Sequence, residues 1–310
     1  MIINTGMRTD IPAFYSEWLR NRVREGYVLV RNPFDPLQVT KYDLDPEVVD
    51  IMAFCTKDPS PLIPYLDEFD DFHPFWFITI TPYGKEIEPN VPPKEKVIEA
   101  FKTVSEHIGA DSVSWRYDPI FISDKYSVQA HIKAFGEMAR SLRGYTGQAV
   151  ISFIDLYEKT KRNFPQVQKV KKEERESIYR AFAKIGKENS MVIRSCAEGD
   201  EPSRYGIDIS GCMTQQILEA SCGERLLVPG SEMRARKECS CLLGRDIGAY
   251  NSCAHDCLYC YANYDKKLVR RNMRLHDPDS PFLIGGAMPG DRIRQAKQSS
   301  YISDQLMMEL

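Results

Sequence analysis

Short apolar runs alternate six times with longer segments of helical period, and this alternation constrains the fold more than any other feature of the 310-residue sequence. It is typical of β–α–β units, in which consecutive strands lie parallel in one sheet and helices cover it. The predicted strands are Ile2–Asn4, Val48–Phe54, Phe75–Thr81, Ser112–Trp115, Ala149–Ile154 and Met191–Arg194. The predicted helices are Ala13–Glu25, Pro61–Phe69, Lys94–His107, Val128–Leu142, Glu173–Lys187 and Thr214–Ala220.

Six such units predict an α/β fold, specifically a partial or full TIM-like (β/α) barrel. The segment Tyr27–Leu44 interrupts the first unit with two strand-like pieces around a proline-rich turn, and we expect a hairpin there. An open sheet, completed by this hairpin or by the run Phe282–Ile284, is the alternative to a closed barrel.

Charged residues follow several of the predicted strands. In β/α barrels the active site lies at the C-terminal ends of the strands. We therefore expect substrate contacts from Arg8, Asp10, Arg116, Asp118 and Arg194. A structural origin is the alternative, because solvated loops are polar in any case and Asp10 precedes Ile-Pro as a helix N-cap would.

Charge and cysteine content narrow the classes of function. A formal net charge of −3 provides no general attraction to nucleic acid or to an anionic membrane. The N-terminus lacks a secretory leader and no stretch of about 18 apolar residues is present, so we expect a cytoplasmic protein. In a reducing cytosol the nine cysteines favour metal binding or catalysis over structural disulfides.

Three cysteines near the C-terminus, Cys253, Cys257 and Cys260, have the spacing Cys-x3-Cys-x2-Cys. Thiolates at this spacing can surround one compact centre, and soft thiolate ligands select iron–sulfur clusters, zinc or Cu(I). Three ligands leave one metal position open, which is typical of a catalytic site. A structural zinc site completed by His255 or Cys241 is the alternative.

The cysteine motif resembles that of the radical S-adenosylmethionine (SAM) superfamily, in which an aromatic residue, here Tyr259, precedes the last cysteine. The form CAHDCLYCYAN is most similar to the spore photoproduct lyase-like branch. This resemblance implies that Cys253, Cys257 and Cys260 hold a [4Fe–4S] cluster whose fourth iron chelates SAM. It also implies that Tyr259 packs near the adenine and that reductive cleavage of SAM yields a 5′-deoxyadenosyl radical.

The whole chain resembles the bacterial domain-of-unknown-function 1848 family, which pairs an Arg-Thr-Asp-Ile-Pro segment, here Arg8–Pro12, with a terminal cysteine cluster. That family supplies no reaction. In the radical SAM superfamily the motif follows the first barrel strand, whereas here it follows the sixth predicted strand. If the last strand lies beside the first, this order is only a permutation, and the cysteines sit over the barrel mouth facing Arg8 and Asp10.

Four more cysteines could close a second, auxiliary cluster, namely Cys196, Cys212, Cys239 and Cys241, with Cys222 as a substitute. They could instead bind a structural zinc ion, or Cys196, Cys212 and Cys222 could be small buried apolar residues. The cysteine-rich part suggests two domains, a barrel-like domain over residues 1–235 and an iron–sulfur-binding segment over residues 236–310.

The sequence therefore favours a radical SAM-type iron–sulfur enzyme. Its expected partners are SAM, an unidentified substrate that could be anionic, and an electron donor such as flavodoxin or ferredoxin. Two other classes stay open. One is a non-catalytic iron–sulfur protein that transfers electrons or senses redox state, and the other is a zinc-stabilised binding module.

Overall fold

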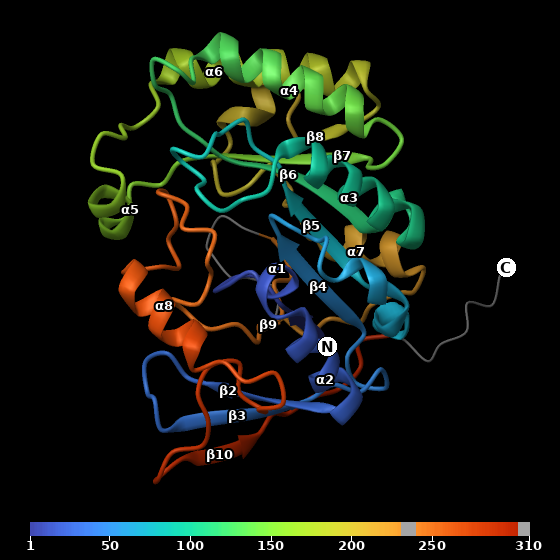
Figure 1. Cartoon of the computed structure of the whole chain (residues 1–310). Helices are drawn as coiled ribbons and strands as arrows, with labels where there is room; N and C mark the ends of the chain where they lie inside the picture. The colour runs from blue at the N-terminus through green and yellow to red at the C-terminus, as the bar shows by residue number, and fades with distance from the viewer. Residues whose placement is uncertain (231–239, 303–310) are drawn as a thin grey trace, which may run out of the picture.

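The computed structural model describes residues 1–230 and 240–302, and a seven-stranded sheet lies at its centre (Figure 1). The strand order is β8-β7-β6-β5-β4-β1-β9, and every neighbouring pair is parallel. The strands are β1 (Ile2–Asn4), β4 (Ile51–Thr56), β5 (Phe75–Thr79), β6 (Val113–Ile120), β7 (Gln148–Phe153), β8 (Val192–Ser195) and β9 (Arg245–Asp246). The six strands predicted from the alternation are confirmed, and β9 adds an edge beside β1.

The sheet is open, so the closed form of the predicted barrel is wrong. The backbone of Asp208 already runs along the outer edge of β8. The amide of Ser195 donates to the carbonyl of Asp208, and the amide of Asp208 donates to the carbonyl of Ile193, each at 2.9 Å. Because these bonds satisfy the edge groups of β8, strand β9 has no free partner there and the sheet stays open.

Helices flank the sheet. The α-helices are α1 (Ile11–Phe14), α2 (Ser16–Glu25), α3 (Lys94–Ile108), α4 (Val128–Leu142), α5 (Glu158–Asn163), α6 (Lys172–Glu188), α7 (Gln215–Cys222) and α8 (Lys266–Arg274). The 3₁₀ helices are η1 (Ile63–Phe72), η2 (Ala110–Ser112) and η3 (Glu201–Tyr205). All six predicted helical segments are present, but the first is divided at Tyr15 into α1 and α2, the second is a 3₁₀ helix, and α5 and α8 were not predicted. None of the helices in the described part of the chain is long and apolar enough to cross a membrane.

The two faces of the sheet pack against different parts of the chain. Helices α3, α4 and α6 cover the first face (Figure 1), where Trp115 stacks on Phe135 with ring centroids 4.6 Å apart. On the second face, Ile51 and Phe75 pack in one buried cluster with Leu242 and with residues of the segment around α7. Alternate residues of each strand point to opposite faces, so both sides of the sheet are buried.

A smaller sheet lies beside the main one (Figure 1). The predicted hairpin is confirmed as the antiparallel pair β2 (Tyr27–Arg31) and β3 (Gln38–Asp43), and β10 (Arg292–Gln295) adds to β3 in parallel. Phe282 forms a bridge to Leu29, so the Phe282–Ile284 run lies along the hairpin and not in the main sheet. The predicted boundary at residues 235/236 falls outside the described residues, and the division into two domains stays a prediction.

A buried histidine on α4 predicts a pH-dependent stability. Nε2 of His131 donates to the carbonyl of Phe121 at 2.9 Å, and Nδ1 lies 2.8 Å from the hydroxyl of Tyr117. Burial lowers the pKa of His131 from 6.5 to about 4. Between these values the unfolded chain binds a proton that the folded chain does not, so the free energy of unfolding decreases as the pH falls from about 6.5 to about 4.

We expect His131→Gln to remove this contribution, which amounts to at most roughly 3 kcal/mol. The measurement is urea unfolding of both proteins at several pH values between 4 and 7. The wild-type stability should fall more steeply toward acid than that of the variant. Parallel curves would show that His131 contributes nothing to the pH dependence.

Candidate functional site

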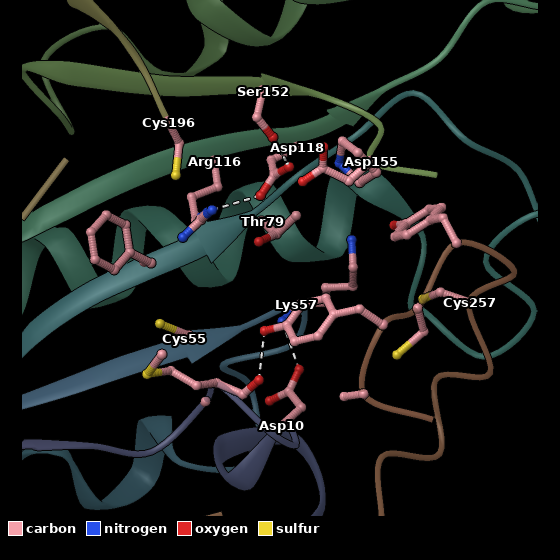
Figure 2. Close-up of a pocket in the computed structure, with 18 of the residues that line it drawn as sticks. Asp10, Cys55, Lys57, Thr79, Arg116, Asp118, Ser152, Asp155, Cys196 and Cys257 are labelled. Atoms are coloured by element: carbon pink, nitrogen blue, oxygen red, sulfur yellow. Dashed lines mark hydrogen bonds and ion pairs between the residues drawn. The ribbon is translucent and has the colours of Figure 1, made fainter. Parts of the chain in front are cut away.

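A cavity of about 430 Å³ lies at the carboxyl ends of the parallel strands (Figure 2). Parallel strands bring their carboxyl ends to one edge of a sheet, and loops from all of them can meet there. The loop after β9 forms another wall of the cavity with residues 253–262. Six strands each contribute a side chain to the cavity, from the strand itself or from the loop after it. Thr79, Arg116 and Ser152 lie on β5, β6 and β7, and Asp10, Lys57 and Cys196 follow β1, β4 and β8.

Cys253, Cys257 and Cys260, called the first cysteine set, line the cavity from the loop after β9. The amide of Cys260 donates to the carbonyl of Cys257 at 3.1 Å, which closes a tight turn between these two residues. All three thiols are free. Burial raises the pKa of Cys257 and of its two neighbours, so each thiol keeps its proton unless a cation stabilises the thiolate.

The donors of the first cysteine set fit a [4Fe–4S] cluster, since three free thiols on one loop face one cavity. Among residues 1–230 and 240–302, no three Cys, His, Asp or Glu side chains surround one point closely enough to hold a single metal ion. The thiolates of a [4Fe–4S] cluster do not need to surround a single point, because each of them binds a different iron. Cys253, Cys257 and Cys260 are therefore compatible with a cluster as they stand.

Asp10 connects three segments at the edge of the cavity. Its Oδ2 accepts from Nε2 of His255 and from the amide of Lys57, each at 2.8 Å, and its Oδ1 caps α1 by accepting from the amide of Ala13 at 3.1 Å. His255 lies inside the cysteine motif, is 3% exposed and packs edge-on against Phe14. The Arg-Thr-Asp-Ile-Pro segment and the cysteine loop, 245 residues apart, therefore meet through this pair.

Glu88 is the centre of a buried charge network beside the first cysteine set. Its carboxylate accepts from Nζ of Lys57 at 2.9 Å, from the hydroxyl of Thr81 at 2.7 Å, and from Lys94 and the hydroxyl of Tyr259. Burial opposes ionisation of Glu88, but the ammonium groups of Lys57 and Lys94 outweigh it and hold the pKa at about 2. Glu88 therefore fixes Tyr259 on the cavity wall with its hydroxyl bonded to a carboxylate.

Arg116 and Asp118 lie together on β6 and point into the same space (Figure 2). Nη2 of Arg116 donates to Oδ2 of Asp118 at 2.6 Å, and the hydroxyl of Ser152 on β7 donates to the other carboxylate oxygen. The guanidinium carbon lies 5.4 Å from the ring centre of Phe77. Burial disfavours the charged guanidinium, but the carboxylate of Asp118 outweighs this and raises the pKa of Arg116. The structure brings both predicted residues to the cavity.

Arg8 and Arg194 do not line this cavity. Nε of Arg8 donates to Oδ2 of Asp246 at 2.5 Å, which ties the segment after β1 to β9. Arg194 on β8 donates to the side chains of Gln148 at 2.7 Å and Asp208 at 2.5 Å. Both arginines hold neighbouring segments of the sheet edges together, and the structure does not place them with Asp10, Arg116 and Asp118.

A second group of cysteines lines the cavity from the second face of the sheet. Cys196, Cys212 and Cys241, called the second cysteine set, come from the end of β8, the loop before α7 and the segment before β9. Cys239, the fourth predicted ligand, lies outside the described residues. Cys55 at the end of β4 lines the cavity too, and burial raises the pKa of its thiol to about 12.

Residues 2–262 match the model of a family described as domain of unknown function (DUF1848). The chain belongs to this family. The DUF1848 match begins at β1 and ends directly after the cysteine loop, so it contains all seven strands of the main sheet and both cysteine sets. No curated protein and no solved structure matches the chain.

Within the DUF1848 region, Lys57 and Glu88 lie beside the cysteine loop but were not among the residues expected to contact the substrate. Lys57 directly follows β4, so its position after a buried strand was a usable signal. Glu88 lies between β5 and α3 in a stretch without periodic apolar residues, and no local pattern distinguishes it from a solvated loop carboxylate. Its burial depends on Lys57, Lys94 and Tyr259, which are distant in sequence.

Proposed function

We propose that the cavity is the active site of a radical SAM-type iron–sulfur enzyme. One observation carries the proposal. Strand β9, which leads into the cysteine loop, lies at the edge of the sheet beside β1. In the superfamily that the motif resembles, the motif follows the first strand of the barrel. Here the motif follows β9, the edge strand beside β1. Its late position in the sequence is therefore compatible with the same placement over the strand ends.

Cys253, Cys257 and Cys260 would hold a [4Fe–4S] cluster, and SAM would bind in the adjoining cavity with its adenine near Tyr259. The cluster supplies the electron for reductive cleavage of SAM when both are bound. The chain would keep Tyr259 in place through Glu88, while Asp10 anchors the cysteine loop through His255. These contacts orient the loop before any substrate arrives.

Arg116, Asp118 and Ser152 would bind the substrate on the opposite side of the cavity from the cysteine loop. Figure 2 shows Arg116 and Asp118 across the cavity from Cys257. The guanidinium of Arg116 is a suitable partner for an anionic substrate group, because it lines the cavity and stays charged. Asp118 and Ser152 then hold the guanidinium in one orientation. Arg8 and Arg194 would act only by holding the sheet edges.

The same proposal includes an electron donor, such as flavodoxin or ferredoxin, and a cytoplasmic location. A reducing compartment suits a site whose described cysteines are all free thiols.

Anaerobic purification followed by metal analysis and electron paramagnetic resonance tests the proposal. We expect about four iron and four sulfide per chain in the first cysteine set, and a spectrum of the reduced protein that changes when SAM is added. A spectrum that SAM leaves unchanged would indicate an electron-transfer or redox-sensing protein. Protein without iron, stabilised by zinc alone, would indicate a binding module and contradict the proposed enzyme.

A further inference from the structure

Helix α8 presents a row of cations to solvent. It contains no acidic residue and five basic ones, namely Lys266, Lys267, Arg270, Arg271 and Arg274. All five are exposed. At 3.6 residues per turn these positions fall within one half of the helix circumference, and the opposite half carries Val269, which is 2% exposed. Burial of Val269 therefore fixes the orientation in which α8 turns its charges outward.

The spacing of these cations is unfavourable for the helix itself. Lys266 and Arg270, Lys267 and Arg271, and Arg270 and Arg274 are each four positions apart, so like charges are neighbours on the helix surface. Lys266 and Lys267 also lie in the first turn, where the helix dipole disfavours positive charge. Among the described residues only Lys266 forms an ion pair, with Asp256 at 3.8 Å. An anionic partner from outside the chain would compensate the remaining charges.

The N-terminal end of α8 lies directly outside the first cysteine set. A hollow of about 90 Å³ is lined there by Lys266 and Tyr264 together with Cys257. Cys257 also lines the main cavity. The first cysteine set therefore has the cavity on one side and the surface beside α8 on the other, and an electron that enters at α8 has a short path to a cluster held by Cys257.

Helix α5 extends the basic surface toward the same loop. Nζ of Lys159 donates to the carbonyl of Tyr261 at 3.0 Å, and Arg162 donates to the carbonyl of Tyr264. Figure 1 shows α5 and α8 on the same side of the molecule. Lys159 also covers one face of the Tyr264 ring, with Nζ 3.5 Å from the ring centre. That face is closed to a stacking base, so the surface favours an acidic protein over a nucleic acid.

We propose that α8, together with Lys159 and Arg162 of α5, is the docking surface for an acidic electron-donor protein. The reduced donor loses one electron to the cluster at the first cysteine set, and no atom is transferred. This inference rests on the proposed iron–sulfur function, which requires an external electron. The chain as a whole carries a charge of −3, so the attraction is confined to this surface and orients the donor on it. Redox encounters bury little area, which suits a single helix and the adjoining turn.

Titration of fluorescently labelled flavodoxin, an acidic one-electron donor, with the anaerobically purified protein tests the docking surface. We expect the affinity to fall at least about tenfold when the salt concentration rises from about 20 to about 200 mM. At low salt it should fall at least about tenfold in Arg270→Glu/Arg271→Glu, because the charge that attracts the donor is reversed. Dithionite needs no docking surface and should reduce this variant as it reduces the wild type.

Lys133→Glu/Lys187→Glu is the matched control. It makes the same change of charge at exposed positions of α4 and α6, away from α8 (Figure 1), and the affinity should stay within about twofold of the wild type. Equal affinity of the α8 variant and the wild type, an equal loss in the control, or no binding to the wild type would overturn the docking surface. Tighter binding of single-stranded RNA than of flavodoxin, lost in the α8 variant, would overturn it in favour of a nucleic acid.

The spectrum of the dithionite-reduced protein with and without SAM tests the proposed function separately. A cluster that responds to SAM, in a protein that flavodoxin binds equally well with and without the α8 charges, would refute the docking surface alone. A protein without a reducible cluster would refute the proposed function, whatever the binding shows.

Discussion

Cys257→Ala should abolish formation of 5′-deoxyadenosine from SAM, because it removes one of the three thiolates that the proposed cluster requires. Cys257 is 8% exposed, lines the cavity and lies on the loop between β9 and α8. Cys257 is the one cysteine between Cys253 and Cys260 on this loop, so no other thiol there can replace it without a movement of the backbone. We expect iron content to fall with activity, measured on anaerobically purified protein by metal analysis and by chromatography of the nucleoside product.

Cys222→Ala is the matched control for Cys257→Ala. It also removes one thiol, but from the end of α7 and outside the cavity, so activity and iron should match the wild type. Circular dichroism of both metal-free variants checks that the fold is intact. Full activity and iron content in a folded Cys257→Ala variant would contradict the assignment of the first cysteine set to the reaction.

Glu88→Gln should destabilise the fold by about 3–5 kcal/mol, because it removes a buried carboxylate and leaves two partly buried ammonium groups without their counter-charge. Glu88 is 1% exposed, and the ammonium groups of Lys57 and Lys94 both contact its carboxylate. Glutamine has the same shape and can still accept hydrogen bonds, so the loss measures charge and not packing. Urea unfolding of the metal-free protein at neutral pH gives the difference in the free energy of unfolding.

Two further variants make the Glu88 result specific. Glu99→Gln also removes a carboxylate that is paired with a lysine, Lys102, but its side chain is 72% exposed, and we expect a change within about 0.5 kcal/mol. Combining Glu88→Gln with Lys57→Met removes one unpaired ammonium and should recover part of the stability. A loss below about 1 kcal/mol in Glu88→Gln alone would mean that solvent already compensates the two lysines.

The local patterns were sufficient for the strands and for most helices. The run Met191–Arg194 predicted β8, and the helical period of Val128–Leu142 predicted α4 with the same bounds. Such elements depend on residues that are adjacent or a few positions apart, and the apolar period reports which face is buried. Barrel closure is different, since it depends on whether the edge of β8 is free. Asp208, 13 residues after β8 ends at Ser195, occupies that edge.

The candidate site was only partly predictable, for the same reason. Arg116 and Arg194 looked alike in the sequence, as charged residues at the end of a predicted strand, yet only Arg116 lines the cavity. Arg194 bonds to Asp208 and Gln148, and Arg8 bonds to Asp246. Arg116 is paired with a carboxylate as well, that of Asp118, so the arginines differ in whether the fold places the pair in the cavity wall. A single sequence carries no record of those partners.

The sequence by itself determined that the chain is an α/β protein, and its cysteine spacing predicted a site for soft metals after the strands. Alternation and cysteine spacing are local properties, and they survive in the sequence without any knowledge of the fold. The tertiary structure alone decided that β9 lies beside β1, that both cysteine sets face one cavity, and that Glu88 anchors Tyr259 there. These relations join residues up to about 240 positions apart, and they follow from how strands pair and where charges are buried.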